Sequence, residues 1–166
     1  MVKHIYSNLT KKENLSKITI LTCFLLCLTS CKRYKDFRDV GVWKHLSDYE
    51  CVDGYTRVGD KIYGGNYYGI QIWDITKPMK GVDVETFCVC EGSQYAKDMN
   101  HVYYPIRIIC EDADEFGGCY FLEYVISGIK PSDFRYIGNG YGTDGYDLVY
   151  EGKIVPWSKY TESKKE

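Results

Sequence analysis

The chain reads Val102-Tyr103-Tyr104-Pro105-Ile106-Arg107-Ile108-Ile109 near its middle, a pattern typical of a β-strand. Side chains in a strand alternate between its two faces, so the apolar even-numbered residues share one face. Tyr103, Arg107 and Ile109 share the other face. Pro105 has no N–H to donate to a neighbouring strand, which predicts either an edge strand or a β-bulge at this residue.

Two further segments have strand patterns that predict hairpins. Leu148 to Val155 reads as two short strands around a tight Glu151-Gly152 turn. Ile62 to Tyr68, with a Gly-Gly pair inside it, predicts another hairpin. Sixteen of the 17 tyrosines follow residue 30, and tyrosine favours strands. The sequence therefore predicts a mainly β fold of antiparallel hairpin or meander repeats with short helical turns.

A local pattern recurs along the chain and indicates a degenerate repeat. Asp60, Asp98 and Asp144 each precede an apolar residue and a tyrosine by a few positions. An aspartate side chain can accept hydrogen bonds from backbone amides two residues further on, which favours a turn. We therefore expect each of these aspartates to open a turn from which a strand begins.

A second recurring element ends in phenylalanine. Residues 81–87, 111–116 and 128–134 each pass from polar or acidic residues into Phe87, Phe116 and Phe134. A short helical turn capped by Asp or Ser, with the phenylalanine buried, is the simplest interpretation.

The stretch Tyr95-Ala96-Lys97-Asp98-Met99-Asn100-His101-Val102-Tyr103-Tyr104, followed by Asp112-Ala113-Asp114-Glu115-Phe116, resembles the DKNYY repeat family. The similarity is best over residues 95–116. Met99 stands where the family usually has Lys, and Pro105-Ile106 replaces its usual Asn-Gly turn. The resemblance implies an exported bacterial protein, often a lipoprotein, with tandem tyrosine-rich motifs and no established activity. It implies no catalytic residue.

The beginning of the chain has the features of an export signal. An apolar run from Ile18 to Leu28 precedes Leu28-Thr29-Ser30-Cys31, and the residues before that run are basic: Lys3, Lys11, Lys12 and Lys17. A bilayer-spanning helix needs about 20 apolar residues, more than this run contains. Leu28 to Cys31 resembles the lipobox of bacterial lipoproteins, in which the cysteine is acylated and becomes the first residue. A secretory peptide without lipid is the alternative.

These features divide the chain into four predicted parts. Residues 1–30 form a lipoprotein signal peptide, residues 31–54 a lipidated start and tether, residues 55–157 the β-rich repeat domain, and residues 158–166 a polar tail. Lys32 follows Cys31, where some inner-membrane lipoproteins have Asp, and no acidic run follows. We therefore expect a lipid anchor in the outer membrane, with the domain facing the periplasm.

The charge balance bears on the class of partner. Removing residues 1–30 removes four of the 21 Lys and Arg and one of the 23 Asp and Glu, which leaves a net charge of −5. Nucleic-acid binding usually requires basic patches that neutralise phosphates, so we expect no nucleic-acid partner. The expected partners are the membrane, through lipidated Cys31, and an envelope protein or a glycan.

Five cysteines remain after the signal peptide and the lipidated Cys31 are set aside. They are the candidates for disulfide bonds: Cys51, Cys88, Cys90, Cys110 and Cys119. Exported chains meet conditions that permit disulfides, and an odd number leaves at least one cysteine outside an internal pair. Cys88 and Cys90 would share one face of a strand, so they are poor partners for each other, but each could reach a different neighbouring strand. Buried reduced thiols and, last, a metal site are the alternatives.

Few residues suggest catalysis or a cofactor. After the signal only His45 and His101 remain, and no known nucleophile, metal or phosphate motif is present. The acidic residues 111–115 favour capping over calcium binding, because Phe116 occupies a position that a calcium loop needs for a ligand. We therefore expect no cofactor and no catalytic residue, and the alternative is a hydrolase without a recognisable motif.

Aromatic residues suggest a binding surface. Trp43, Trp73 and Trp157 and the tyrosines could form a platform for a sugar ring or a protein. The alternative is that one tyrosine face packs in the core and the other decorates the sheet. The function expected from the sequence is a non-catalytic β-repeat interaction module. The alternatives are an envelope hydrolase without a recognisable motif and a glycan binder with an aromatic platform.

Overall fold

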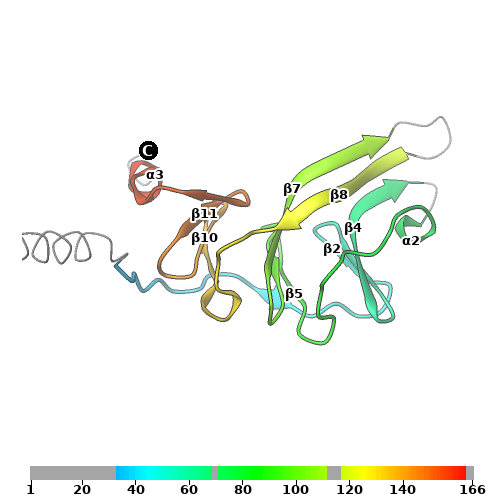
Figure 1. Ribbon diagram of the computed structural model, residues 1–166, viewed down its shortest axis with the longest axis horizontal. Helices are drawn as coiled ribbons and strands as arrows, with labels where there is room; N and C mark the ends of the chain where they lie inside the picture. The colour runs from blue at the N-terminus through cyan, green and yellow to red at the C-terminus, as the bar shows by residue number, and fades with distance from the viewer. Residues whose placement is uncertain (1–32, 69–70, 112–116, 164–166) are drawn as a thin grey trace, which may run out of the picture. The chain divides into compact units, whose positions relative to one another are not determined.

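The computed structural model describes residues 33–68, 71–111 and 117–163 (Figure 1). The predicted mainly β, antiparallel fold is confirmed. One sheet has eight strands, in the order β1 (Trp43–Lys44), β5 (Cys88–Cys90), β6 (Ala96–Lys97), β7 (Val102–Glu111), β8 (Gly117–Val125), β4 (Lys61–Tyr68), β3 (Tyr55–Val58) and β2 (Cys51–Val52). The second sheet has the order β12 (Lys153–Val155), β11 (Leu148–Tyr150), β10 (Tyr141–Thr143) and β9 (Arg135–Gly138). The described helices are α2 (Ile72–Ile75), α3 (Trp157–Glu162) and a 3₁₀ turn at Pro131–Asp133.

The repeat in the sequence becomes three antiparallel meanders of three strands. They are β2–β3–β4, β5–β6–β7 and β9–β10–β11, and neighbouring strands pair in each of them. A tyrosine begins or directly precedes the middle strand of each meander. An apolar residue of the third strand follows this tyrosine by seven positions. The pairs are Tyr55 and Ile62, Tyr95 and Val102, and Tyr141 and Leu148. Strand β8 pairs with both β7 and β4 and so joins the first two meanders into one sheet.

The middle meander lies between two hydrophobic cores. The first core includes Tyr55 and Ile62 from the first meander, and the second includes Phe134 and Val149 from the third. Successive residues of the middle meander enter opposite cores, as alternation along a strand requires. The pairs are Val89 and Cys90, Ala96 and Tyr95, and Tyr103 and Val102, with the first-core residue named first.

The bulge predicted at Pro105 is confirmed. The register of β7 against β8 shifts between Tyr103 and Arg107 and again between Arg107 and Ile108. Strand β7 lies between β6 and β8, so the alternative of an edge strand is wrong. The predicted apolar face is buried at the start of β7, where Val102 is wholly buried, but not at Ile108, which is 45% exposed. The ribbon of β7 and β8 therefore extends beyond the second core.

Of the two hairpins predicted from segment patterns, one is confirmed and the other is wrong. Strands β11 and β12 flank Glu151 and Gly152, whose φ angles of 48° and 75° are typical of a tight hairpin turn. Residues 61–68 instead form the single strand β4. Its glycines serve close packing, because a Cβ atom on Gly65 would overlap the carbonyl oxygen of Cys119 on β8.

Two of the three predicted aspartate turns are confirmed. Asp98 Oδ1 accepts hydrogen bonds from the amides of Asn100 and His101, each at 2.7 Å. Asp144 Oδ1 accepts from the amides of residues 146 and 147, each at 2.9 Å. The prediction for Asp60 is wrong, because Val58 has the equivalent place in the first meander. There Asp48 Oδ1 accepts from the amide of Gly59 at 2.6 Å.

The predicted burial of the phenylalanines is confirmed for Phe87 and Phe134, each 1% exposed. The 3₁₀ turn precedes Phe134, as expected. Turns rather than a helix precede Phe87, where Asp83 Oδ1 accepts from the amide of Thr86 at 3.0 Å. The prediction for Phe116 lies outside the described residues.

The folded unit begins earlier than the sequence suggested. A compact unit spans Lys35–Glu166 and includes strands β1 and β2, which lie in the predicted tether of residues 31–54. Leu46 is 3% exposed in the first core, and Phe37 stacks on Trp157 with ring centroids 5.4 Å apart. The polar composition of residues 32–38 concealed this packing. Helix α3 likewise enters the predicted polar tail.

The predicted signal peptide and Cys31 lie outside the described residues. Within the described part of the chain, no helix is long and apolar enough to cross a membrane.

Candidate functional site

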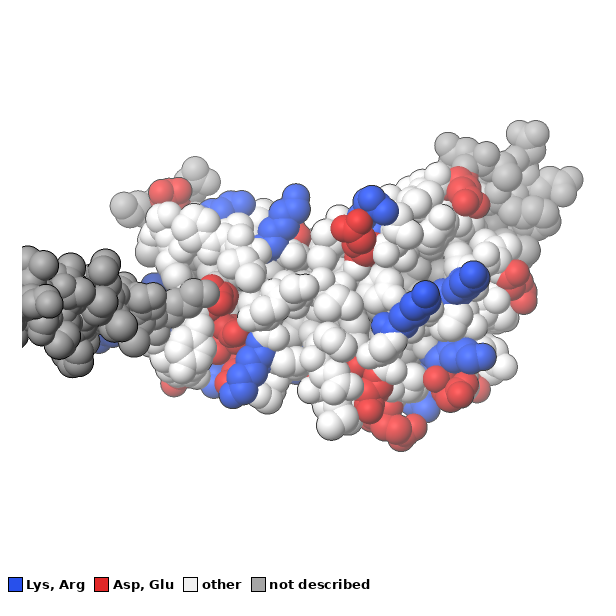
Figure 2. All heavy atoms as spheres, in the orientation of Figure 1, with Lys and Arg blue, Asp and Glu red and all other residues white. Residues whose placement is uncertain are grey.

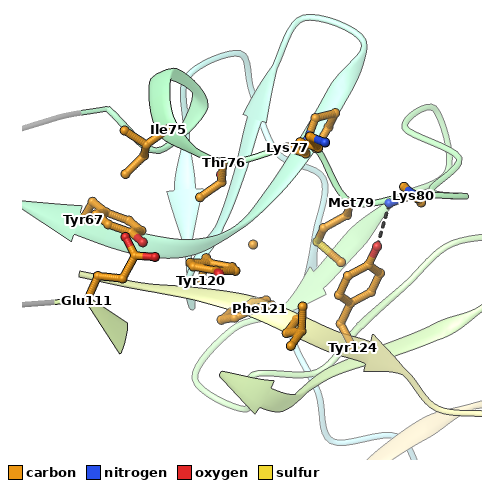
Figure 3. A pocket seen from close by; sticks show the side chains of 13 residues that line it. Tyr67, Ile75, Thr76, Lys77, Met79, Lys80, Glu111, Tyr120, Phe121 and Tyr124 are labelled. Carbon is orange, nitrogen blue, oxygen red and sulfur yellow. Dashed lines mark hydrogen bonds between the residues drawn. The ribbon is translucent and has the colours of Figure 1, made fainter. Parts of the chain in front are cut away.

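A groove of about 460 Å³ lies where strand β4 separates from β8 (Figure 3). We call it the fork groove. One wall is formed by side chains of β4 and β8, and the opposite wall by Ile75 at the end of helix α2 and by residues 76–80, which follow it. The lining residues are Gly64, Tyr67, Ile75, Thr76, Lys77, Pro78, Met79, Lys80, Glu111, Tyr120, Phe121, Leu122 and Tyr124.

The fork arises because β4 pairs with two different strands. Its second half, from Gly65 to Tyr68, pairs with β8, while its first half pairs with β3. The chain after α2 then closes the fork from the other side. The Met79 amide donates to the Ile62 carbonyl at 2.8 Å, and the Lys80 amide donates to the Tyr124 hydroxyl at 2.7 Å.

Glycines let aromatic rings form the groove. A Cβ atom on Gly118 would overlap the backbone and ring of Tyr67, so the absence of a side chain lets Tyr67 lie across β8. A Cβ atom on Gly64 would overlap the ring of Phe121, which also packs on Tyr55 with centroids 5.2 Å apart. Through Phe121, the groove wall therefore packs directly against the first core.

The two ends of the fork groove carry opposite charges (Figure 3). Glu111 and Tyr67 lie at one end, where burial and then the Glu111 carboxylate raise the pKa of Tyr67. Lys77 and Lys80 lie towards the other end, where the Lys80 amide donates to the Tyr124 hydroxyl. Among the described residues no ion pair engages Glu111, Lys77 or Lys80. Aromatic and aliphatic side chains separate the two ends.

A smaller hollow of about 130 Å³ lies on the other side of Tyr67, beside Tyr49, Cys51 and Trp73. The rings of Tyr49 and Trp73 meet edge to face with centroids 5.5 Å apart. Cys51 is exposed and free. The hollow is too small for the ligands that pockets of several hundred Å³ bind.

The three tryptophans have separate surroundings. Trp43 donates from Nε1 to Asp39 Oδ2 at 2.9 Å and packs against Phe134, while Trp73 packs against Tyr49. Trp157 stacks on Phe37 and donates from Nε1 to the carbonyl of Tyr146 at 3.2 Å. In the described residues no ring contact joins two tryptophans, and a joint platform of Trp43, Trp73 and Trp157 stays a prediction.

One disulfide bond forms among the five candidate cysteines. It joins Cys110 and Cys119, which face each other across β7 and β8 with Cα atoms 4.0 Å apart. Cys88 and Cys90 are buried and free, and burial raises the pKa of both thiols. The expectation of partial disulfide bonding fits this arrangement, but pairing of Cys88 or Cys90 with a neighbouring strand does not occur.

The histidines are held by neighbouring groups. His45 Nδ1 lies 2.8 Å from the Phe87 carbonyl oxygen, and His101 Nδ1 lies 3.4 Å from the Tyr103 hydroxyl. Within residues 33–68, 71–111 and 117–163, no group of three or more His, Cys, Asp or Glu side chains could hold a metal ion. The acidic stretch considered for calcium lies outside the described residues except for Glu111.

On the face of the molecule in Figure 2, basic and acidic side chains are interspersed. Ion pairs account for some of this mixing, such as Arg107 Nε with Glu123 Oε1 at 3.2 Å.

Comparisons with known proteins found no matching family model, no matching curated protein and no matching solved structure. The resemblance to the DKNYY repeat family therefore stays a prediction.

The fork groove was missed in the sequence because four separate segments build it, one of which is Glu111 at the end of β7. Tyr67, the stretch 75–80 and the strand from Tyr120 to Tyr124 carry no shared motif. The only sequence signal is the alternation of Tyr120, Leu122 and Tyr124, which also suits a strand over a core.

Proposed function

We propose that this chain is a membrane-tethered bacterial envelope lipoprotein whose β-repeat domain is a non-catalytic interaction module. The single observation that carries the anchor is Leu28-Thr29-Ser30-Cys31 directly after an apolar run with a basic start. A single acyl chain anchors a protein only marginally, so several chains on one cysteine would suffice without a second membrane segment. The proposed location is the periplasmic side of the outer membrane.

The role of the carboxylates supports a scaffold over an enzyme. Asp98 is 5% exposed and accepts four hydrogen bonds, from the amides of Asp83, Asn100 and His101 and from the Tyr103 hydroxyl. Asp144 is 4% exposed and accepts hydrogen bonds from three backbone amides. Both side chains are buried, and their hydrogen bonds to backbone amides shape turns of the repeat.

The second and third meanders also support membership of a tandem repeat family. Asp83 and Lys130 donate their amides to Asp98 and Asp144 respectively, at 2.7 and 3.2 Å. Each hydrogen bond joins the segment before a buried phenylalanine to the second turn of the meander that follows it. Such a repeated scaffold suits a protein that presents a surface to a partner.

Replacing Cys31 with Ser tests the anchor. We expect the variant to leave the membrane fraction, while the matched control Cys51→Ser stays in it, because Cys51 is an exposed thiol in the folded unit. Continued membrane association of the Cys31→Ser chain, without acyl groups, would contradict the proposal.

A further inference from the structure

We infer that the fork groove binds an extended peptide segment of an envelope protein, with a basic side chain at one end and an acidic side chain at the other. This inference rests on the proposed role as an interaction module and names the class of partner. It is carried by the shape of the groove and by the separation of its charges.

The wall formed by β8 has the period of an extended peptide. Tyr120, Leu122 and Tyr124 are alternate residues of one strand, so their side chains leave the same face at intervals of about 6.8 Å. A peptide in the extended conformation places its own alternate side chains at the same interval. Its apolar side chains can therefore enter the spaces between the aromatic rings in register.

The groove has enough length for several residues of such a peptide. Glu111 pairs with Gly118, and Lys80 is hydrogen-bonded to Tyr124, so the charged ends are separated by the length of β8 between these residues. The six steps from Gly118 to Tyr124 along β8 span about 20 Å. A ligand that reaches both ends is therefore about six residues long.

Charge complementarity decides what stands at each end of the peptide. A basic side chain would meet Glu111 and the Tyr67 hydroxyl, and an acidic side chain would meet the ammonium groups of Lys77 and Lys80. The three charged residues are exposed and engage in no ion pair within the described residues, so they require no rearrangement to bind. An uncharged glycan would gain nothing from this separation of charge.

A random hexapeptide library displayed on phage tests the inference with the full-length protein in detergent. We expect selection of extended sequences with one basic and one acidic residue at opposite ends and apolar residues between them. Glu111→Lys should shift the selection to peptides acidic at both ends and weaken the original peptides by about fivefold or more. The double variant Lys77→Glu/Lys80→Glu should shift it to peptides basic at both ends.

The matched control is Glu123→Lys, which reverses an exposed carboxylate of β8 that does not line the groove. It should leave the selected peptides and their affinity unchanged. Absence of any enriched sequence, a preference that the groove variants do not alter, or binding on a glycan array that those variants abolish would each overturn the inference. Since the assay does not depend on Cys31, its failure is distinguishable from a failure of the membrane anchor.

Discussion

The hydroxyl of Tyr55 donates a hydrogen bond to the carbonyl of Gln94 at 3.0 Å. Gln94 directly precedes Tyr95, the tyrosine that has the same place in the next meander. Tyr95 in turn donates to the carbonyl of Gly140 at 3.0 Å, and Gly140 directly precedes Tyr141. A buried tyrosine of each of the first two meanders is thus hydrogen-bonded to a backbone carbonyl of the following meander, and this relay joins the three repeats.

Removing one hydroxyl of the relay should weaken the fold. Tyr95→Phe leaves the ring in the core but removes the shorter of the two hydrogen bonds to the Gly140 carbonyl, which also accepts from the Glu151 amide at 3.4 Å. We therefore expect a loss of about 1 kcal/mol in the free energy of unfolding. Urea denaturation checks this. Tyr49→Phe is the control, because Tyr49 is 64% exposed and should change stability by no more than a few tenths of a kcal/mol. Equal effects of the two substitutions would contradict the relay.

The aspartates of the repeat should differ sharply in importance. Asp98→Ala removes the acceptor of three amides and one hydroxyl, and we expect a loss of about 3 kcal/mol in the free energy of unfolding. Asp60→Ala should change it by less than about 0.5 kcal/mol, because Asp60 is exposed and lies outside the turn-opening position. Thermal unfolding of both variants compares them, and similar losses would refute the assignment of Val58 to that position.

The fold should be lost at alkaline pH. Burial raises the pKa of Tyr55, Tyr95 and Tyr103 above the ordinary value of 10.0. The unfolded chain therefore releases these protons near pH 10 while the folded chain retains them, so stability falls as pH rises above about 10. We expect tyrosinate absorbance from these side chains to appear together with loss of near-UV circular dichroism. Full ionisation with an intact dichroism signal would contradict the burial of these hydroxyls.

The cysteines should react in three groups. Cys51 is exposed and should be alkylated in the native protein, whereas Cys88 and Cys90 should react only in denaturant, because both are buried and burial raises the pKa of their thiols. Cys110 and Cys119 should react only after reduction. Peptide mapping by mass spectrometry checks all five, with Cys51→Ser as a control for the native label. A disulfide that includes Cys51 or Cys88 would contradict the structure.

The local parts of the fold could be predicted from the sequence because local chemistry determines them. The turn at Glu151-Gly152, the bulge at Pro105 and the aspartate turns at Asp98 and Asp144 each follow from one or two residues with strict backbone requirements. The Gly64-Gly65 pair was misread for the same reason. Glycine favours a turn, but here it lets β4 approach β8, and this requirement comes from a distant strand.

The long-range parts could not be predicted. Residues 31–54 were predicted to be a tether, yet Phe37 packs against both Trp157 and Tyr160, more than a hundred residues away. The fork groove likewise depends on where β4 changes partners from β8 to β3, which no single segment encodes. The tryptophans that the sequence suggested for a binding surface, Trp43, Trp73 and Trp157, do not line the fork groove.

The intact mass of the native protein extracted from membranes tests the proposed lipoprotein most directly. We predict a chain that begins at Cys31, has lost residues 1–30 and carries the added mass of several acyl chains on that residue. A chain that retains residues 1–30, or one that starts elsewhere without acyl groups, would contradict the account.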